Sequence, residues 1–340
     1  MTMSEVKQKD LFEDKDREKD IASINRLFQD IERYRKSENF KMMLDFYASF
    51  PYLGVYNAAL VEQQRPGARM VLTVKKWAEL YDRKIKSNAR PVIILLPFYP
   101  VEFLFDIYDT RPNGKYSKTE DNYVIDRIIN RHKAECKYDV GFYLNNIKEN
   151  LPKFGIAYHN YYVVGSEIQS EIRIDDSEEL RIKINRDLSI IHNSHFILSV
   201  RSGADDAEQL ASIFHELGHL FCLHLSYPWF KDRSYTKEVK EFEAEVVSYL
   251  VCSRIGIRTQ SMEYLAYYVE ENEEIPAIDI ERIFDAVDLI EQIIKGKRDI
   301  SKCLLYKKDK TFKEKVDKVK ESLKKEKERF NREQDGNPSF

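Results

Sequence analysis

The segment FHELGHLF, residues 214–221, constrains the fold of this chain more than any other feature of its sequence. On a helix, residues four apart lie one above the other on the same face, so His215 and His219 point in the same direction. Their neighbours are mostly apolar, and burying two imidazoles and the Glu216 carboxylate among them is costly without a partner such as a metal ion. We therefore expect a buried helix built around a metal site. The alternative is an ordinary buried helix with two satisfied histidines.

The spacing of these residues suits a catalytic zinc ion. Two ligands one helical turn apart fit one tetrahedral ion, which then needs a third protein ligand and an open position for water. Zinc lowers the pKa of its bound water to about 7, and Glu216 is placed to accept that proton and pass it to the leaving amine. Glu216 is thus the predicted general base. Loose candidates for the donor that stabilises the transition state are His224, Tyr227 and Tyr235.

A later helix, KEFEAEVVSYLVCSRIGI at residues 240–257, offers the third ligand. At about 100 degrees per residue, Glu241 and Glu245 share one narrow strip of small and polar residues, whereas Glu243 points elsewhere. Such a strip on an otherwise apolar helix is typical of a helix that gives a carboxylate to a metal. Two alternatives remain open. Both glutamates could lie on the solvent face, or Cys222 could be a ligand rather than a small core residue.

Composition indicates a globular protein with no membrane segment. Hydrophobic residues make up 43% and charged residues 33% of the chain, and the formal net charge is -3. No apolar run reaches the length of about 18 residues that spans a bilayer, and the charged N-terminus is unlike a signal peptide. The four cysteines are far apart and form no CxxC pair, which argues against a disulfide framework. We expect a cytoplasmic protein.

Turn chemistry at Arg111-Pro112-Asn113-Gly114 predicts a domain boundary. The expected parts are a flexible N-terminus (1–20), a first domain (21–112), a second domain (113–300) and a charged C-terminal helix or tail (301–340). From Tyr306 onward the tail has 12 Lys or Arg against 8 Asp or Glu, which favours a solvated helix over a nucleic-acid-binding arm. Expected strands are residues 70–73, 92–96 and 103–108, then EIRI, LRIKIN and FILSV. Expected helices are residues 21–47, one ending before Arg65, 123–136, 140–150, 209–225, 237–254 and 280–295.

The zinc motif resembles that of a known family. HELGH followed about twenty residues later by E-x-E-A-E is similar to the ImmA/IrrE-type zinc metallopeptidases and to the related zincin domain of ArdC-like antirestriction proteins. The resemblance implies an α+β, gluzincin-type zincin domain with an HExxH helix, a small mixed sheet and a third-ligand helix. It also implies zinc bound by His215, His219 and Glu241, because these families share a glutamate three residues before the alanine. Glu245 is then an alternative ligand or a residue that positions the ligands. An edge strand beside the metal is expected to hold an extended peptide.

The segment at residues 50–98 resembles the small α+β single-stranded-DNA-binding domain of ArdC-like proteins. The resemblance rests on Tyr56-Asn57, on Gln64 with Pro66 and Ala68, on Trp77 and on the strand ending at Pro97. This chain departs from the family where YDRKIKSNAR replaces the usual glycines, which weakens the expectation of DNA contacts.

Charge and aromatic residues in the same segment are compatible with binding single-stranded DNA. Between Arg65 and Arg90 there are eight Lys or Arg and two acids, interleaved with Trp77 and Tyr81. A single-strand platform needs cations for the phosphates and rings for stacking. The predicted contacts are Trp77, Lys75, Lys76, Arg83 and Lys84. The alternative is that Trp77 belongs to the core and the cations only solvate a surface.

Two classes of function follow from the resemblances. The first is a zinc-dependent endopeptidase that cleaves a protein partner, such as a helix-turn-helix repressor, in a mobile-element, defence or stress-response circuit. Single-stranded DNA would then be its trigger. The second is an ArdC-like antirestriction or DNA-binding protein in which the zinc holds the fold. A purely structural zinc would not need Glu216, so the sequence favours the first.

Overall fold

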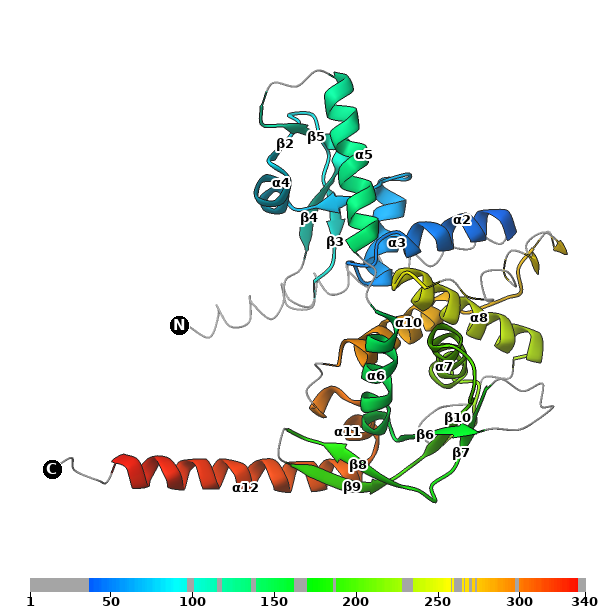
Figure 1. The fold of residues 1–340 in the computed structure, drawn as a ribbon, viewed down its shortest axis with the longest axis vertical. Coiled ribbons are helices and arrows are strands. Elements are labelled where there is room, and N and C mark those ends of the chain that lie inside the picture. Colours follow the sequence, from blue (N-terminus) through cyan, green and yellow to red (C-terminus); the bar gives the residue numbers. More distant parts are fainter. Residues whose placement is uncertain are drawn as a thin grey trace, which may run out of the picture. The chain divides into compact units, whose positions relative to one another are not determined.

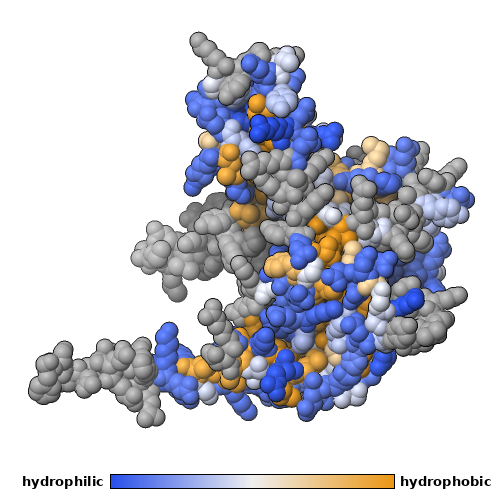
Figure 2. Space-filling model, in the orientation of Figure 1, coloured by the Kyte–Doolittle hydropathy of each residue, from blue (hydrophilic) through white to orange (hydrophobic). Residues whose placement is uncertain are grey.

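A computed structural model describes most of the chain as an α+β protein with small sheets and many helices (Figure 1). The described residues are 37–96, 101–114, 118–135, 139–161, 170–185, 188–227, 235–257, 259, 265, 267–268, 271–272, 274–296 and 300–335. They divide into two compact units, residues 1–139 with 236–288 and residues 140–235 with 289–340. None of the helices in these ranges is long and apolar enough to cross a membrane. Hydrophilic residues predominate on the face shown in Figure 2.

The first unit contains two small antiparallel sheets. Strand β4 (Glu102–Asp106) pairs with β1 (Val71–Leu72) on one side and with β3 (Val92–Ile94) on the other. A second pair joins β2 (Arg83–Ile85) to β5 (Thr110–Pro112). The helices of this unit are α2 (Ser37–Ala48), α3 (Val55–Gln64), α4 (Val74–Tyr81), α5 (Lys118–Glu135), α8 (Lys237–Arg254) and the start of α10 (Ile280–Lys295), with a short 3-10 turn, η2 (Ile107–Asp109).

The core of the sheet region extends beyond the predicted boundary. Ile125 and Ile128 of α5 pack in one apolar cluster with Trp77 and Ile107. Since α5 completes this core, the first unit continues through Arg111–Gly114 to residue 139 instead of ending at residue 112. A turn motif marks a change in chain direction and does not by itself show which core the next helix joins.

The second unit is built on a three-stranded mixed sheet. Its central strand β10 (Phe196–Arg201) runs parallel to β6 (Ile156–Tyr161) and antiparallel to β7 (Ser170–Ile174), which therefore lies at an edge. A separate antiparallel pair joins β8 (Glu179–Lys183) to β9 (Ser189–Asn193). The helices and 3-10 turns are α6 (Val140–Asn150), η3 (Leu151–Phe154), α7 (Asp206–Phe221), the end of α10, η4 (Ile300–Lys302), α11 (Leu304–Lys308) and α12 (Lys310–Asp335).

Helix α7 is held against this mixed sheet. It contacts β7 and β10, and α6 packs beside it. Asp205 caps its first turn, because the carboxylate accepts hydrogen bonds from the backbone N–H groups of Ala207 and Glu208 at 2.9 and 2.8 Å. Its apolar residues, including Leu210, Phe214 and Leu217, are fully buried. The helix that carries the HELGH motif is therefore a central element of this unit.

Most long elements lie where the sequence places them. The helices α6, α8 and α10 have the predicted limits, and the predicted strands correspond to β1, β3, β4, β7, β8 and β10. The structure adds α4, β2, β5, β6 and β9, which the sequence does not predict. The helix predicted at residues 21–47 lies partly outside the described residues, and its described part is α2. The charged tail forms α12, whose first turns are anchored by the buried Phe312 and Val316.

Candidate metal centre

The two histidines of α7 converge as the helical spacing predicts. The Nε2 atoms of His215 and His219 lie 3.1 Å apart. In a tetrahedral zinc site with bonds of about 2.0–2.1 Å, two nitrogen ligands are about 3.3 Å apart, so the observed separation fits two ligands of one ion. The spacing of the two residues on α7 places both rings on one side of the helix.

The turn after α7 brings a third histidine, His224, next to His219. The sequence suggests His224 only as a loose candidate for the transition-state donor. Leu223 adopts a left-handed conformation with φ of 63°, and the N–H of His224 then donates to the carbonyl of His219 at 2.9 Å. This turn brings the Nδ1 atoms of His219 and His224 to 2.9 Å, and His224 is buried. Ligating histidines are commonly oriented through their second ring nitrogen. His224 therefore orients the His219 ring so that Nε2 faces His215.

Glu241 completes the candidate ligand set. The ligand atoms of His215, His219 and Glu241 all lie within 4.8 Å of one another. Two imidazoles and one carboxylate are the donor set of a catalytic zinc site of the His₂Glu type, which keeps a further position open. The α+β structure thus contains a candidate His/Glu metal-binding group of the kind expected from the sequence, and its donor set fits zinc.

Glu216 has a defined partner in its own unit. Its carboxylate accepts a hydrogen bond from the Ser170 hydroxyl at 2.8 Å and another from the backbone N–H of Ile172 at 3.0 Å. Both donors belong to the edge strand β7. Only 8% of the Glu216 side chain is exposed. The carboxylate of the motif is therefore held in one orientation beside the strand expected to receive a peptide.

The other two glutamates of α8 have different surroundings. Glu245 is half-buried and does not belong to the group formed by Glu241 and the two histidines of α7. Glu243, which the helical wheel directs elsewhere, is fully buried, and its carboxylate accepts a hydrogen bond at 2.7 Å from the N–H of Asp279. That N–H lies just before α10, where a carboxylate stabilises unpaired N–H groups.

The two tyrosines proposed as transition-state donors lie in different surroundings. The hydroxyl of Tyr227 lies 2.5 Å from Nδ1 of His195, a residue outside the HELGH motif. Burial raises the pKa of the Tyr227 hydroxyl, and the charge of Asp309 adds to that effect. Tyr235 is 36% exposed.

Two of the predicted DNA contacts need correction. The Trp77 side chain is 0% exposed, and its indole N–H donates to the Phe105 carbonyl at 2.8 Å. The Arg83 side chain is 1% exposed, and its guanidinium donates to Asp121 at 2.7 Å and to the Thr110 hydroxyl at 2.6 Å. A buried ring cannot stack on a base and a buried guanidinium cannot reach a phosphate.

The three predicted lysine contacts remain available. Lys75, Lys76 and Lys84 are exposed. Lys75 makes only a long ion pair of 3.8 Å with Glu79 one turn away, which is weak because both groups are solvated. These lysines could still contact phosphates, and the alternative interpretation of Trp77 as a core residue is the one that the structure supports.

Comparisons of the chain with models of protein families, with curated proteins and with solved structures give no match.

Proposed function

We propose that this chain is a zinc-dependent endopeptidase whose ligands are His215, His219 and Glu241 and whose general base is Glu216. The observation that carries the proposal is the candidate ligand group, in which the ligand atoms lie within 4.8 Å of one another, next to a carboxylate held in a fixed orientation. When bound, zinc acts as a Lewis acid that activates water for attack on a carbonyl carbon.

The chain's own residues supply the proton transfers. Glu216 accepts a proton on a carboxylate oxygen and delivers it to the departing amine nitrogen, while Ser170 and the Ile172 N–H orient the carboxylate. His224 orients the His219 ring through the Nδ1 atoms. The edge strand β7 offers backbone groups to an extended substrate segment, which is a common way of binding peptides. The proposed substrate is a protein partner, such as a helix-turn-helix repressor in a mobile-element, defence or stress-response circuit.

Glu216→Gln tests the base directly. This variant should retain zinc, because Glu216 is not among the proposed ligands, and should lose at least about a hundredfold in cleavage. Ser170→Ala is the matched control, since it removes one hydrogen bond to the same carboxylate and leaves the base in place. Equal activity of Glu216→Gln and wild type would remove Glu216 from the mechanism. Equal losses of cleavage in Glu216→Gln and Ser170→Ala would instead assign Glu216 a structural role as an acceptor of hydrogen bonds from β7.

The ligand assignment has its own measurement. Alanine variants of His219 and Glu241 should each bind one zinc per chain fewer than the wild type in elemental analysis, whereas Glu245→Ala should keep the wild-type content. Retention in Glu241→Ala together with loss in Glu245→Ala would move the third ligand to Glu245.

An ArdC-like antirestriction role is the second candidate. The exposed Lys75, Lys76 and Lys84 favour it, and the burial of Trp77 removes its predicted stacking ring. To separate the two, wild type and Glu216→Gln are each co-expressed with the regulator encoded beside this gene, with and without added single-stranded DNA in the lysate. Loss of intact regulator only with the wild type supports the peptidase. An equal biological effect of both proteins supports the binding role.

A further inference from the structure

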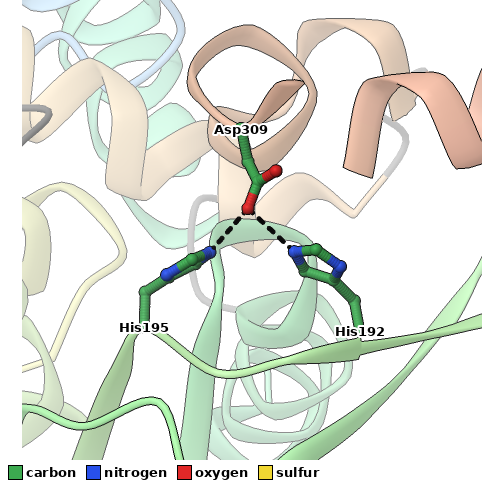
Figure 3. A group of neighbouring side chains, drawn as sticks. All are labelled: His192, His195 and Asp309. Atoms are coloured by element: carbon green, nitrogen blue, oxygen red, sulfur yellow. Dashed lines mark hydrogen bonds and ion pairs between the residues drawn. The ribbon is translucent and has the colours of Figure 1, made fainter. Parts of the chain in front are cut away.

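A second group of potential ligands lies in the unit that carries α7, away from the HELGH motif. His192 is on β9, His195 is in the short connection to β10, and Asp309 precedes α12. Both histidine rings point toward one carboxylate oxygen of Asp309 (Figure 3). The Nε2 atom of each ring lies 2.9 Å from Oδ2 of Asp309. All three ligand atoms lie within 4.8 Å of one another.

The three side chains are held in place from several sides. Asp309 caps α12, because its other oxygen, Oδ1, accepts a hydrogen bond from the N–H of Phe312 at 2.9 Å. The His192 ring packs against the Phe312 ring, with centroids 5.1 Å apart. His195 lies against Gly155, where an added Cβ would come within 2.9 Å of the imidazole ring. The ligand atoms are therefore positioned by the backbone and by packing before any ion binds.

The second nitrogen of His195 also has a partner of the kind found around metal sites. The Tyr227 hydroxyl lies 2.5 Å from Nδ1 of His195, and the rings meet edge to face with centroids 5.8 Å apart. When Nε2 coordinates a metal, Nδ1 carries the proton and donates it to an oxygen, which fixes the tautomer and the ring orientation. Tyr227 supplies that oxygen.

Burial makes a carboxylate shared by two imidazole rings suitable for a cation. The side chains of His192, His195 and Asp309 are 7%, 15% and 13% exposed. A shared Oδ2 can accept two hydrogen bonds, but a divalent ion would satisfy both imidazole lone pairs and the carboxylate charge together. We propose that His192, His195 and Asp309 bind a divalent transition-metal ion that ties β9 to the start of α12. Two nitrogens and one oxygen are a donor set that suits zinc.

The test uses zinc itself and the full chain. The background variant His215→Ala/His219→Ala removes the proposed HELGH site, so the result does not depend on the proposed function. After chelation and dialysis, this background should bind one zinc per chain. Asp309→Asn in the same background keeps an oxygen to cap α12 and removes the charge, and its zinc affinity should fall at least about tenfold. His159→Ala is the matched control, because His159 forms an exposed pair of 2.8 Å with Glu178 in the same unit, and it should change nothing.

A second readout covers the case in which the background does not fold. In the wild type, bound zinc should be two per chain and should fall to one in Asp309→Asn, and zinc should slow amide exchange in the first turns of α12. A folded background that takes up no zinc at micromolar concentration would overturn the proposal. Equal zinc content in Asp309→Asn and the wild type would overturn it as well. The cluster would then be a hydrogen-bonded triad that holds α12.

Discussion

Arg83 is predicted from local charge as a DNA contact, but its hydrogen-bond partners give it a structural role. Its guanidinium is buried, bonded to Asp121 and to both oxygens of Thr110, and it thereby connects β2, β5 and α5. Removing one partner of a buried pair leaves an uncompensated charge, although Asp121 is 21% exposed and water reduces the penalty. Arg83→Ala should therefore lower the free energy of unfolding by about 3 kcal/mol. Urea unfolding measures it, and the exposed neighbour Lys84→Ala should cost about 0.5 kcal/mol or less. Equal effects of the two variants would contradict this role.

Cys252 provides a pH-dependent prediction at the same scale. Burial raises the pKa of its thiol from 9.0 to about 12, and the charge of Glu245 acts in the same direction while hydrogen bonds oppose it. In the unfolded chain the thiol ionises near pH 9, so between pH 9 and 12 unfolding releases a proton and rising pH favours the unfolded state. In the folded protein the Cys252 thiol should also be unreactive towards thiol reagents, because only the thiolate is the nucleophile.

The measurement uses a Cys136→Ser variant so that only the three described cysteines can react. Cys136 itself lies outside the described residues. Cys222, Cys252 and Cys303 are all buried. A thiol reagent at pH 8 should modify none of them in the native state and all of them in denaturant. Rapid modification of Cys252 in the native protein would show that this helix face opens to solvent.

At the scale of elements, side chains of helix α3 cover an edge of the sheet, which the sequence does not predict. Strand β3 is at an edge of its sheet, and edge strands expose unpaired backbone groups. The Asn57 amide donates to the Leu95 carbonyl at 2.9 Å and accepts from the Leu95 N–H at 3.0 Å. Gln64, two turns later, does the same with Ile93 at 2.8 and 2.9 Å. The two amides therefore replace a neighbouring strand.

Asn57→Ala should leave both backbone groups of Leu95 without these partners and cost about 1–3 kcal/mol of stability. Amide exchange should accelerate at Leu95, whose N–H donates to Asn57, and should change little within α3. Gln63→Ala, at an exposed position on the same helix, is the control and should stay within about 0.5 kcal/mol of the wild type. Unchanged exchange at Leu95 would show that another group covers this edge.

The sequence predicts the elements that carry a long or strong pattern and misses those set by distant contacts. Helices α6, α8 and α10 are recognised because apolar residues repeat over three or more turns. Helix α4 has eight residues and begins at the Thr73 cap, a signal too short to outweigh the strands around it. The pairing of His192 and His195 with Asp309 spans more than a hundred residues, and no local pattern encodes it. The His215–His219 spacing is local, and the sequence predicts it.

At the scale of the whole molecule, nucleic-acid binding must overcome an unfavourable net charge. The chain carries a formal charge of -3, so any attraction to DNA has to come from a local group of cations. The exposed Lys75, Lys76 and Lys84 are the remaining candidates among the predicted contacts. If they contact phosphates, binding of an oligothymidine strand should be weak and should fall steeply with salt, because each contact releases counterions.

Replacing these three lysines by glutamine should reduce the slope of log affinity against log salt by about 2, that is about 0.7 for each lost contact. The matched control replaces Lys318, Lys324 and Lys327 of α12, which are also exposed, so the formal charge changes from -3 to -6 in both variants. Fluorescence anisotropy over a series of salt concentrations gives the slope. A reduction confined to the first variant locates the contacts on α4 and β2, because the overall charge is the same in both. Equal reductions would mean that only the total charge matters, and the first unit would then lack a specific phosphate-binding surface.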